Sequence, residues 1–349
     1  MNKKIKKPRR ILITRTDRMG DVVLSTSVIR SVRKQFPEAY IAFMVRPENK
    51  DIVMCNPDLN RVIVYDKYGL QKKFFSTVKF AFALRKDKFD TAIMLHPTNR
   101  VHIMSFLAGI SKRIGYDKDM GWLLTNKMPH KKNMGERHET DYNKDLLAYA
   151  GFDVSGYNNK PYMYTTSEDK GLIDSIEKSH SLKEKKIALH VGASCASKRW
   201  PPERFAKVAD VLIKEYGCDV VLIGADKTEK YSSLVVSSMK ENAVDLTDNL
   251  LLGELAELLS RCMLFISNDS GPVHIASAVG TPAIVVFGRN DPGLSPKRWG
   301  PLGEKDIVLH EPPGCMPCKA HYCEKGFKCL MAVTQEDVIA AAHHILSHS

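Results

Sequence analysis

A short loop at residues 267–274 carries an acidic residue, a hydroxyl and a histidine directly after a predicted buried strand. Gly271 and Pro272 open the next predicted helix and leave its N-terminal N–H groups free to face an anion. The alternative interpretation is a well-capped helix over a buried His274, because capping also favours small and hydroxylated residues. This loop is the strongest candidate for anion binding in the sequence.

A second loop, residues 191–200, carries Lys198 near its end. Ser194 and Ser197 add hydroxyl donors ahead of this lysine. Backbone N–H groups, hydroxyls and a cation together suit a diphosphate. The loop does not match the GxxxxGK[ST] pattern of nucleoside triphosphatases, so the sequence predicts a diphosphate site of another kind.

A third polar loop, residues 14–21, contains one glycine and lacks the GxGxxG fingerprint of dinucleotide-binding enzymes. Asp21 lies where this loop passes into a predicted helix. Its carboxylate is suited either to capping the helix N-terminus or to acting as a general base. A dehydrogenase is therefore disfavoured, and Asp21 is a candidate catalytic base.

Short β-branched apolar runs alternate with helical patterns along the chain, which predicts parallel sheets built from βαβ units. The predicted strands are residues 11–14, 41–45, 62–65, 91–95, 187–191, 220–223, 264–267 and 283–287. Helices are predicted at 22–36, after Pro201 and Pro202 with Gly217 as C-terminal cap, at 272–279 and at 335–345. All three polar loops, and a fourth at residues 288–293, then follow strands, at the edge where open parallel sheets bind ligands.

The 349 residues are too many for one ordinary core and predict two domains, separated by a polar stretch at 156–186. No run approaches the roughly 20 apolar residues that span a bilayer. The basic N-terminus resembles the first part of a signal peptide, but Arg15, Asp17 and Arg18 interrupt any apolar segment after it. These features predict a cytoplasmic protein.

Lysine and arginine outnumber aspartate and glutamate by 52 to 40, a formal charge of +12. Such an excess favours an anionic partner: nucleic acid, an anionic membrane face or a phosphorylated substrate. Much of it lies in the first ten residues, either as a solvated tail or as a segment attracted to the inner leaflet of a membrane. No recognised nucleic-acid motif is present, so no nucleic-acid partner is expected.

Four of the eight cysteines cluster as Cys315-x2-Cys318-x4-Cys323-x5-Cys329. Four thiols at this spacing could hold Zn²⁺ or an iron–sulfur cluster in a structural role. A zinc ribbon, however, pairs two separate CxxC units, and this segment has one. Reduced structural thiols are the second interpretation, and a disulfide is disfavoured in a cytoplasmic chain.

The three loops and the segments around them resemble glycosyltransferase family 9. The resemblance rests on TRTDRMGDVVLSTSVIRSVRKQFP, HVGASCASKRWPPERFAKVA, LIGADKTEK, ISNDSGPVHIASAVGTPAIVVFG and CMPCKAHYCEKGFKC, which fall in the family's order. It covers nearly the whole chain, residues 11–345. That family contains the ADP-heptose:lipopolysaccharide heptosyltransferases, which are inverting enzymes of GT-B type with two Rossmann-like doubly wound domains facing a central cleft.

The resemblance implies transfer of a heptose from ADP-heptose to the inner core of a phosphorylated lipid A precursor, at Kdo or at a heptose. Asp21 would be the general base. The implied donor-binding residues are Ser194, Ser197, Lys198, Asp226, Asp269, Ser270, Gly271 and His274. Because lysine and helix N-termini can stabilise a departing diphosphate, no cofactor and no catalytic metal are expected.

The implied acceptor domain spans residues 1–165 and the sugar-nucleotide domain spans residues 166–333, with a last helix at 334–349 packing back on the first domain. Basic and polar residues that could meet the phosphorylated acceptor are Arg15, Arg18, His96, Asn99, Arg100 and Arg113. The protein is expected to be a monomer in the cytoplasm, with the anionic cytoplasmic face of the inner membrane as a peripheral partner.

Three other functions stay open at the level of sequence. One is a family member that binds an ADP-sugar without turnover, which the presence of Asp21 disfavours. Another GT-B nucleotide-sugar transferase or epimerase would share the fold and Lys198 but use a different sugar, for instance a UDP-sugar. A polyanion-binding protein of the nucleic-acid or membrane class would use the basic charge alone. No residue in the sequence identifies adenine, so ADP rests on the resemblance.

Overall fold

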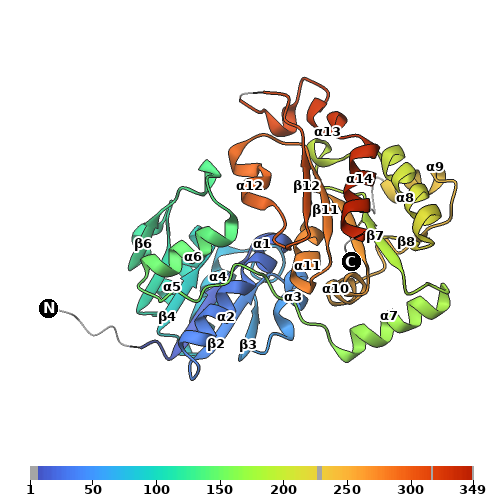
Figure 1. Cartoon of the computed structure of the whole chain (residues 1–349). Helices are drawn as coiled ribbons and strands as arrows, with labels where there is room; N and C mark the ends of the chain where they lie inside the picture. Colours follow the sequence, from blue (N-terminus) through green and yellow to red (C-terminus); the bar gives the residue numbers. More distant parts are fainter. Residues whose placement is uncertain (1–6, 226–229, 316, 348–349) are drawn as a thin grey trace. The chain divides into compact units, whose positions relative to one another are not determined.

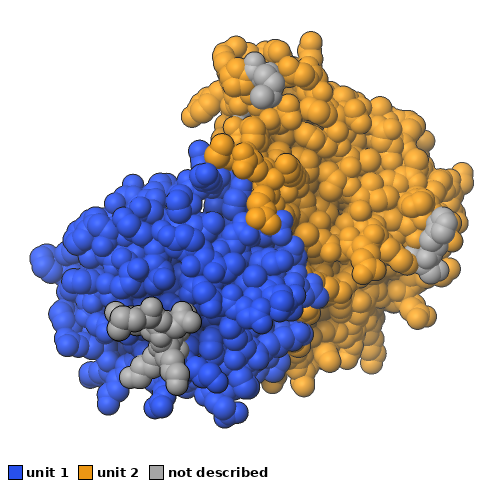
Figure 2. All heavy atoms as spheres, turned by 60° about the vertical axis from the view of Figure 1, so that its left-hand side comes forward, with its two compact units in different colours: residues 1–133, 139–159 blue, residues 134–138, 160–349 orange. Residues whose placement is uncertain are grey.

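The computed structural model describes residues 7–225, 230–315 and 317–347, and the chain divides into two compact units (Figures 1 and 2). Unit 1, blue in Figure 2, comprises residues 1–133 and 139–159, and unit 2, orange, comprises residues 134–138 and 160–349. Among the described residues, each unit contains one six-stranded parallel sheet with helices packed on it. The predicted α/β class with two doubly wound sheets is therefore confirmed.

The sheet of unit 1 has the strand order β3-β2-β1-β4-β5-β6, and all neighbouring strands run parallel. Its strands are β1 (Arg10–Thr14), β2 (Tyr40–Val45), β3 (Arg61–Val64), β4 (Thr91–Met94), β5 (Lys112–Asp117) and β6 (Asn126–Pro129). Ile11 of β1 lies opposite both Ile41 and Thr91, so β1 is central. The strand order reverses between β1 and β4, which makes their carboxyl ends the expected ligand position.

The helices of unit 1 are α1 (Met19–Leu24), α2 (Thr26–Gln35), α3 (Asp51–Met54), α4 (Phe74–Arg85), α5 (Asn99–Leu107) and α6 (Glu139–Tyr149). The structure confirms helix over most of the segment predicted at 22–36 but divides it into two helices at Ser25. The hydroxyls of Ser25, Thr26 and Ser27 bond to carbonyls three or four residues earlier. Such bonds compete with the helical ladder and interrupt the helix.

The sheet of unit 2 repeats the arrangement, with the order β12-β11-β10-β7-β8-β9 and parallel neighbours. Its strands are β7 (Lys186–His190), β8 (Asp219–Leu222), β9 (Val244–Asp245), β10 (Leu264–Asn268), β11 (Ala283–Phe287) and β12 (Ile307–His310). Strands β7, β10 and β11 are buried along their whole length. The order reverses between β7 and β10, so the carboxyl ends of these strands are the equivalent ligand position.

The helices of unit 2 are α7 (Ser167–Ser179), α8 (Pro202–Tyr216), α9 (Tyr231–Ser238), α10 (Leu252–Ser260), α11 (Gly271–Val279), α12 (Pro296–Trp299), α13 (Lys328–Ala332) and α14 (Gln335–Leu346). Short 3-10 turns occur at Pro47–Asn49, Gly121–Leu123, Lys132–Met134, Ala196–Lys198, Pro292–Leu294 and Ala320–Tyr322. Helix α8 confirms the predicted amphipathic helix, and Gly217 ends it with a φ of +61°. The described helices include none that is both long and apolar enough to cross a membrane.

The last helix, α14, buries its apolar face in the core of unit 2, where it packs beside α8 (Figure 1). Val338, Ala342 and Ile345 belong to the same buried cluster as Leu212 of α8. The helix itself was predicted correctly, and the structure assigns it to unit 2. Its packing on the first domain stays a prediction.

The segment predicted as a polar linker, residues 156–186, contains the helix α7. The Thr166 hydroxyl accepts from the Asp169 N–H at 3.0 Å, and the Asp169 carboxylate accepts from the Thr166 N–H at 2.7 Å. This reciprocal cap starts the helix, and Ile173 then buries its side chain. The expected linker is therefore much shorter than the polar stretch in the sequence.

Residues 134–138 belong to unit 2 although the chain on both sides belongs to unit 1. Gly135 has a φ of +62°, and a Cβ at this position would lie 1.7 Å from the Pro292 carbonyl oxygen. Glycine is therefore required there by both conformation and space. His138 adds a contact between its Nε2 and the Gly300 carbonyl oxygen at 3.0 Å.

Candidate functional site

Asp21 lies at the carboxyl edge of the unit 1 sheet, beside the point where the strand order reverses. β1 ends at Thr14, and the loop that follows leads into α1, whose first turn contains Asp21. His96 follows β4, the strand on the other side of the reversal. The sheet topology therefore brings together two residues that the sequence predicted for one site.

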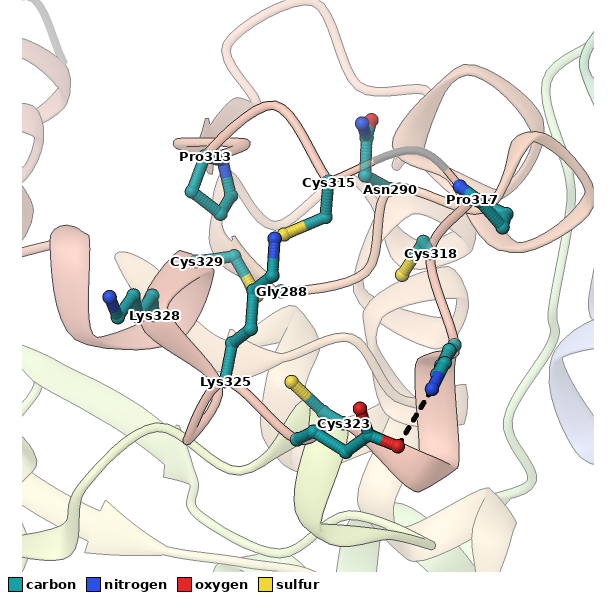
Figure 3. Close-up of a pocket in the computed structure, with 12 residues that line it drawn as sticks. Gly288, Asn290, Pro313, Cys315, Pro317, Cys318, Cys323, Lys325, Lys328 and Cys329 are labelled. Atoms are coloured by element: carbon teal, nitrogen blue, oxygen red, sulfur yellow. Dashed lines mark hydrogen bonds and ion pairs between the residues drawn. The ribbon is translucent and has the colours of Figure 1, made fainter.

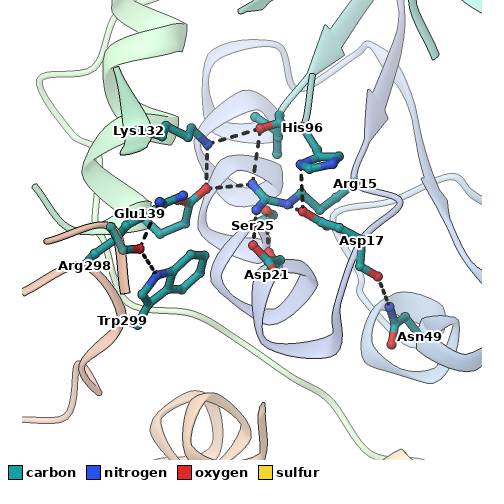
Figure 4. Close-up of polar contacts among 12 residues, drawn as sticks. Arg15, Asp17, Asp21, Ser25, Asn49, His96, Lys132, Glu139, Arg298 and Trp299 are labelled. Atoms are coloured by element: carbon teal, nitrogen blue, oxygen red, sulfur yellow. Dashed lines mark hydrogen bonds and ion pairs between the residues drawn. The ribbon is translucent and has the colours of Figure 1, made fainter. Parts of the chain in front are cut away.

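Arg15 is the centre of a buried ion-pair cluster in unit 1 (Figure 4). Its side chain is 2% exposed, with Nε 2.8 Å from Asp17 Oδ1, Nη1 2.9 Å from Glu139 Oε1, and Nη2 paired with Asp21 Oδ1. Burial by itself lowers the pKa of Arg15, but the three carboxylates outweigh it and raise this pKa well above its usual value. Arg15 therefore holds Asp21 in place, and its burial argues against the direct acceptor contact predicted from the sequence.

Glu139 contributes to this cluster from the start of α6. Its side chain is 0% exposed, and Oε1 accepts from Lys132 Nζ at 2.5 Å as well as from Arg15. Lys132 also donates to the Leu95 carbonyl at 3.2 Å and lies 4.5 Å from the centre of the Tyr116 ring. One buried carboxylate thus serves two buried cations, which satisfies the requirement that interior charges be paired.

Asp21 is more basic than an ordinary aspartate. Its side chain is 12% exposed, and burial together with the nearby Asp17 raises the pKa of Asp21 to about 6, against the opposing effect of Arg15. Asp17 also contacts His96 Nδ1 at 3.1 Å, and burial with the charge of Arg15 lowers the pKa of His96. At pH 7 Asp21 is then ionised and still a useful proton acceptor.

The Glu139 contacts predict a large effect on stability. We expect Glu139→Gln to reduce the free energy of unfolding by about 3–5 kcal/mol, because two buried cations lose the charge they share. Thermal or urea denaturation measures this change. Glu48→Gln is the matched control, since Glu48 is half exposed where it pairs with Arg46, and its loss is expected to stay below about 1 kcal/mol. Equal losses in the two variants would contradict the role of Glu139.

Three further residues predicted for the acceptor lie near the same edge. Arg18 is exposed directly before α1. Asn99 and Arg100 begin α5, where Asn99 Oδ1 accepts from the Met120 N–H at 3.2 Å. The Arg100 guanidinium donates to three backbone carbonyls of the loop at residues 67–72. Contact of these side chains with an acceptor stays a prediction.

The structure does not bring Arg113 to this edge. Arg113 lies near the start of β5, in register with Ala92 near the start of β4, whereas His96 follows the end of β4. Its guanidinium donates to the Leu123 carbonyl at 2.7 Å. This position could not be predicted from the sequence, because β5 begins with two basic residues, which weaken the apolar pattern of a strand.

In unit 2, the loops after β7 and β10 are joined by Asn268. This fully buried residue ends β10, and its Nδ2 donates to the Val191 carbonyl at 2.8 Å while its Oδ1 accepts from the Trp200 N–H at 3.0 Å. Val191 and Trp200 are the two ends of the loop that carries Lys198. The amide of Asn268 therefore fixes this loop next to Asp269.

Asp269 pairs with two cations at the carboxyl edge of the unit 2 sheet. Its Oδ2 lies 3.0 Å from Lys198 Nζ and 2.7 Å from Arg289 Nη2, and all three side chains are largely buried. Burial lowers the pKa of Lys198, and Asp269 opposes this effect. The Nε of Arg289 is buried and has no hydrogen-bond partner within the described part of the chain. Two cations against one carboxylate leave an excess of positive charge that suits a phosphate group.

Ser270 is held by a histidine that the sequence did not single out. Its Oγ lies 3.0 Å from His190 Nδ1 and 3.0 Å from Ser267 Oγ. Gly224, with a φ of +118°, leaves room for the ring, because a Cβ there would lie 2.3 Å from His190 Cδ2. The hydroxyl of Ser270 is thus positioned at the N-terminus of α11.

The remaining donor-site predictions divide between the two loops. Gly271 is the first residue of α11, Ser197 is buried with its Oγ 3.3 Å from Cys195 Sγ, and Ser194 is exposed. His274 is buried one turn into α11, where burial and the neighbouring His138 lower its pKa to about 3, so its ring is neutral. Asp226, predicted near the ribose, lies outside the described residues.

The four clustered cysteines line one cavity of about 270 Å³ (Figure 3). Burial raises the pKa of the Cys329 thiol above its usual value. Across the described ranges, no three His, Cys, Asp or Glu side chains are arranged to hold a metal ion. The structural metal site and the reduced thiols considered from the cysteine spacing both stay predictions.

Sequence reasoning missed several residues of these two clusters: Asp17, Lys132, Glu139 and His190. His190 had a detectable signal, because it is a polar residue at the end of an apolar strand. Arg289 lies in the polar loop at residues 288–293, which was expected to line the same site because it follows a predicted strand. Glu139 had no such signal, because its partner Arg15 is 124 positions away in the sequence.

Comparison with known proteins agrees with this arrangement. The sequence profile of glycosyltransferase family 9, described as heptosyltransferase, matches residues 77–328. Lipopolysaccharide heptosyltransferase 2 of Salmonella typhimurium is 25% identical over 97% of this chain and 99% of that protein.

Two solved structures share the fold over nearly the whole length. A glycosyltransferase of family 9 from Veillonella parvula has a TM-score of 0.89 at 27% identity and covers 98% of both chains. The ADP-heptose lipopolysaccharide heptosyltransferase II of E. coli has a TM-score of 0.78 at 22% identity, covering 97% of this chain and 99% of that one. The fold is therefore of the GT-B type.

Proposed function

Since this chain belongs to glycosyltransferase family 9, the heptosyltransferase family, we propose that it transfers a heptose from ADP-heptose to the inner core of a lipopolysaccharide precursor. The lipopolysaccharide heptosyltransferase it resembles matches over nearly the whole of both chains, which supports the acceptor class. The donor is proposed from the E. coli protein described as an ADP-heptose transferase. The acceptor hydroxyl would belong to Kdo or to a heptose of a phosphorylated lipid A core.

The observation that carries the proposal is the environment of Asp21. A glycosyl transfer to a hydroxyl needs a base near neutral pH, and burial beside Asp17 raises the pKa of Asp21 to about 6. Asp21 would take the proton of the acceptor hydroxyl as its oxygen bonds to the anomeric carbon. The bond from that carbon to the diphosphate breaks at the same time, so one displacement inverts the anomeric centre.

Unit 2 would hold the donor and stabilise the leaving diphosphate. Lys198 pairs with Asp269 in the structure, and a diphosphate would offer this lysine a stronger anionic partner. Asp269, still held by Arg289, could then accept hydrogen bonds from heptose hydroxyls. Ser270 and the N-terminal N–H groups of α11 would add donors to the phosphates. Asp226 is proposed for the ribose on the resemblance alone.

Calorimetric titration with ADP-heptose, ADP and UDP, without added metal, tests this proposal. We expect ADP-heptose to bind most tightly and UDP to bind weakly, because the similar E. coli protein is described as an ADP-heptose transferase. Tighter binding of UDP would keep the GT-B fold and support a transferase or epimerase that uses a UDP-sugar. Absence of binding to all three nucleotides would overturn the proposal and favour a polyanion-binding protein.

A further inference from the structure

Large apolar side chains gather on the surface of unit 1 just before and along α4. Tyr68, Leu70, Phe74, Phe75 and Phe82 are all exposed and lie within residues 68–82, with Leu70 at 81% and Phe75 at 83% exposed. Single exposed apolar residues are ordinary, but a cluster of this kind marks an interaction surface.

Lysines are interleaved with these apolar residues. Lys72 and Lys73 separate Leu70 from Phe74 and are themselves exposed. On α4 and its C-cap, residues 75, 79, 82 and 86 follow one helical stripe and read Phe, Lys, Phe, Lys, all exposed. The opposite stripe of α4, at Thr77, Ala81 and Leu84, is buried in unit 1. The helix therefore presents a mixed apolar and cationic face outward.

The loop ahead of α4 is held in a fixed conformation. The Asp66 carboxylate accepts from the N–H groups of Gly69 at 2.7 Å and Leu70 at 3.1 Å, and these bonds lower the pKa of Asp66. Arg100 donates to the carbonyls of Gln71 at 3.0 Å and Lys72 at 2.7 Å. Leu70 is therefore presented by a preorganised loop, which reduces the entropy lost when the surface docks.

This surface continues into the loop that precedes Asp21. Lys67 Nζ donates to the Thr16 carbonyl at 2.7 Å. The Arg46 guanidinium lies 4.5 Å from the centre of the Tyr68 ring, and its Nη1 donates to the Asp17 carbonyl at 3.4 Å. The exposed apolar side chains and the candidate base thus lie on neighbouring parts of unit 1.

We propose that unit 1 docks on an anionic phospholipid bilayer through an apolar–basic patch formed by Leu70, Lys72, Lys73, Phe74, Phe75 and Lys79. Leucine and phenylalanine enter the boundary between headgroups and acyl chains, while the lysines stay at the level of the anionic headgroups. The cores of protein–protein interfaces are depleted in lysine, so the interleaving favours a bilayer over a protein partner. The patch is independent of the donor assignment.

Co-sedimentation of the full chain with vesicles tests the patch. One set contains phosphatidylglycerol and phosphatidylethanolamine, and the other contains neutral phosphatidylcholine. We expect the double variant Leu70→Ser/Phe75→Ser to bind anionic vesicles at least about tenfold more weakly than the unaltered chain. The matched control is Trp122→Ser/Leu251→Ser, whose residues are 69% and 65% exposed outside the patch, and it is expected to bind normally.

Lys72→Gln/Lys73→Gln tests the electrostatic part. Each lysine near an anionic membrane surface contributes about a fivefold factor, so binding should fall by about 25-fold. The basic N-terminal segment is present in every variant and does not account for a difference among them. Calorimetric nucleotide binding in the same variants shows whether they are folded and whether the donor site is intact.

Four outcomes would overturn the proposal. The first is that the unaltered chain does not bind vesicles, and the second is that it binds anionic and neutral vesicles equally. The third is that the patch and control variants lose vesicle binding equally. The fourth is that a patch variant changes its oligomeric state while its vesicle binding stays unchanged. The last outcome would assign the patch to a second copy of the chain. A failure of nucleotide binding with normal vesicle binding would count against the proposed donor and leave the patch standing.

Discussion

Asp21→Asn is expected to lower the rate of heptose transfer by a factor of about 10² to 10⁴ while donor affinity stays nearly unchanged. The asparagine keeps the size of the side chain but cannot accept the proton of the acceptor hydroxyl. Donor affinity should persist because the cations proposed to bind the diphosphate belong to unit 2. Steady-state rates and calorimetric donor binding, measured on the same preparation, check both parts.

The pH dependence gives a second measurement of the same residue. Asp21 must be deprotonated to act as a base, and its pKa is raised to about 6, so kcat/KM should fall as the pH drops through about 6. Asp17→Asn is the matched control. Because Asp17 raises the pKa of Asp21, its loss should move the acidic fall of kcat/KM to lower pH while the enzyme stays active. Normal turnover by Asp21→Asn would remove Asp21 as the base.

Lys198→Ala is expected to have the second-largest effect, lowering both donor affinity and rate. A hydrogen bond to a charged group contributes about 1.5–3 kcal/mol, which corresponds to a loss of affinity of about 10- to 100-fold. The rate should fall further, by about 10²- to 10³-fold, because the lysine would stabilise charge that develops on the leaving diphosphate. Calorimetry with ADP-heptose and single-turnover kinetics measure the two effects separately.

Lys207→Ala is a suitable control for this variant, because Lys207 is an exposed lysine of α8 in the same unit. Lys207→Ala removes the same formal charge as Lys198→Ala and is expected to leave donor affinity and transfer rate unchanged. Unchanged donor affinity in Lys198→Ala would contradict the proposed phosphate contact. Equal losses in the two lysine variants would point to net charge instead of a specific site.

The architecture was largely predictable from the sequence, since eight of the strands are marked by continuous apolar runs. The strands that were not predicted are short or contain charged residues, such as β9 with two residues and β6 with the sequence NKMP. Their place in the sheet depends on pairing with a neighbour and has little local signal. The division at Ser25 was missed for a related reason, because hydroxyl bonds to the backbone are not visible in an apolar pattern.

The candidate site was predictable only in part. Loops after the central strands could be assigned to one edge from topology, which placed Asp21, Lys198 and Asp269 correctly at sheet edges. Their partners could not be assigned, because Arg15 with Glu139 and Asp269 with Arg289 meet only through tertiary packing. An arginine that the sequence suggests as a contact for an anionic substrate can therefore be ion-paired with buried carboxylates in the structure.

The excursion of residues 134–138 into unit 2 has a consequence for any attempt to exchange the two halves of the enzyme between relatives. In a chimaera with a single junction near residue 159, Gly135 would come from one parent and Pro292, whose backbone it packs against, from the other. Such a junction would also pair His138 with a foreign counterpart of Gly300. A functional chimaera must therefore take residues 134–138 from the same parent as unit 2. The exchanged segment is then discontinuous along the gene.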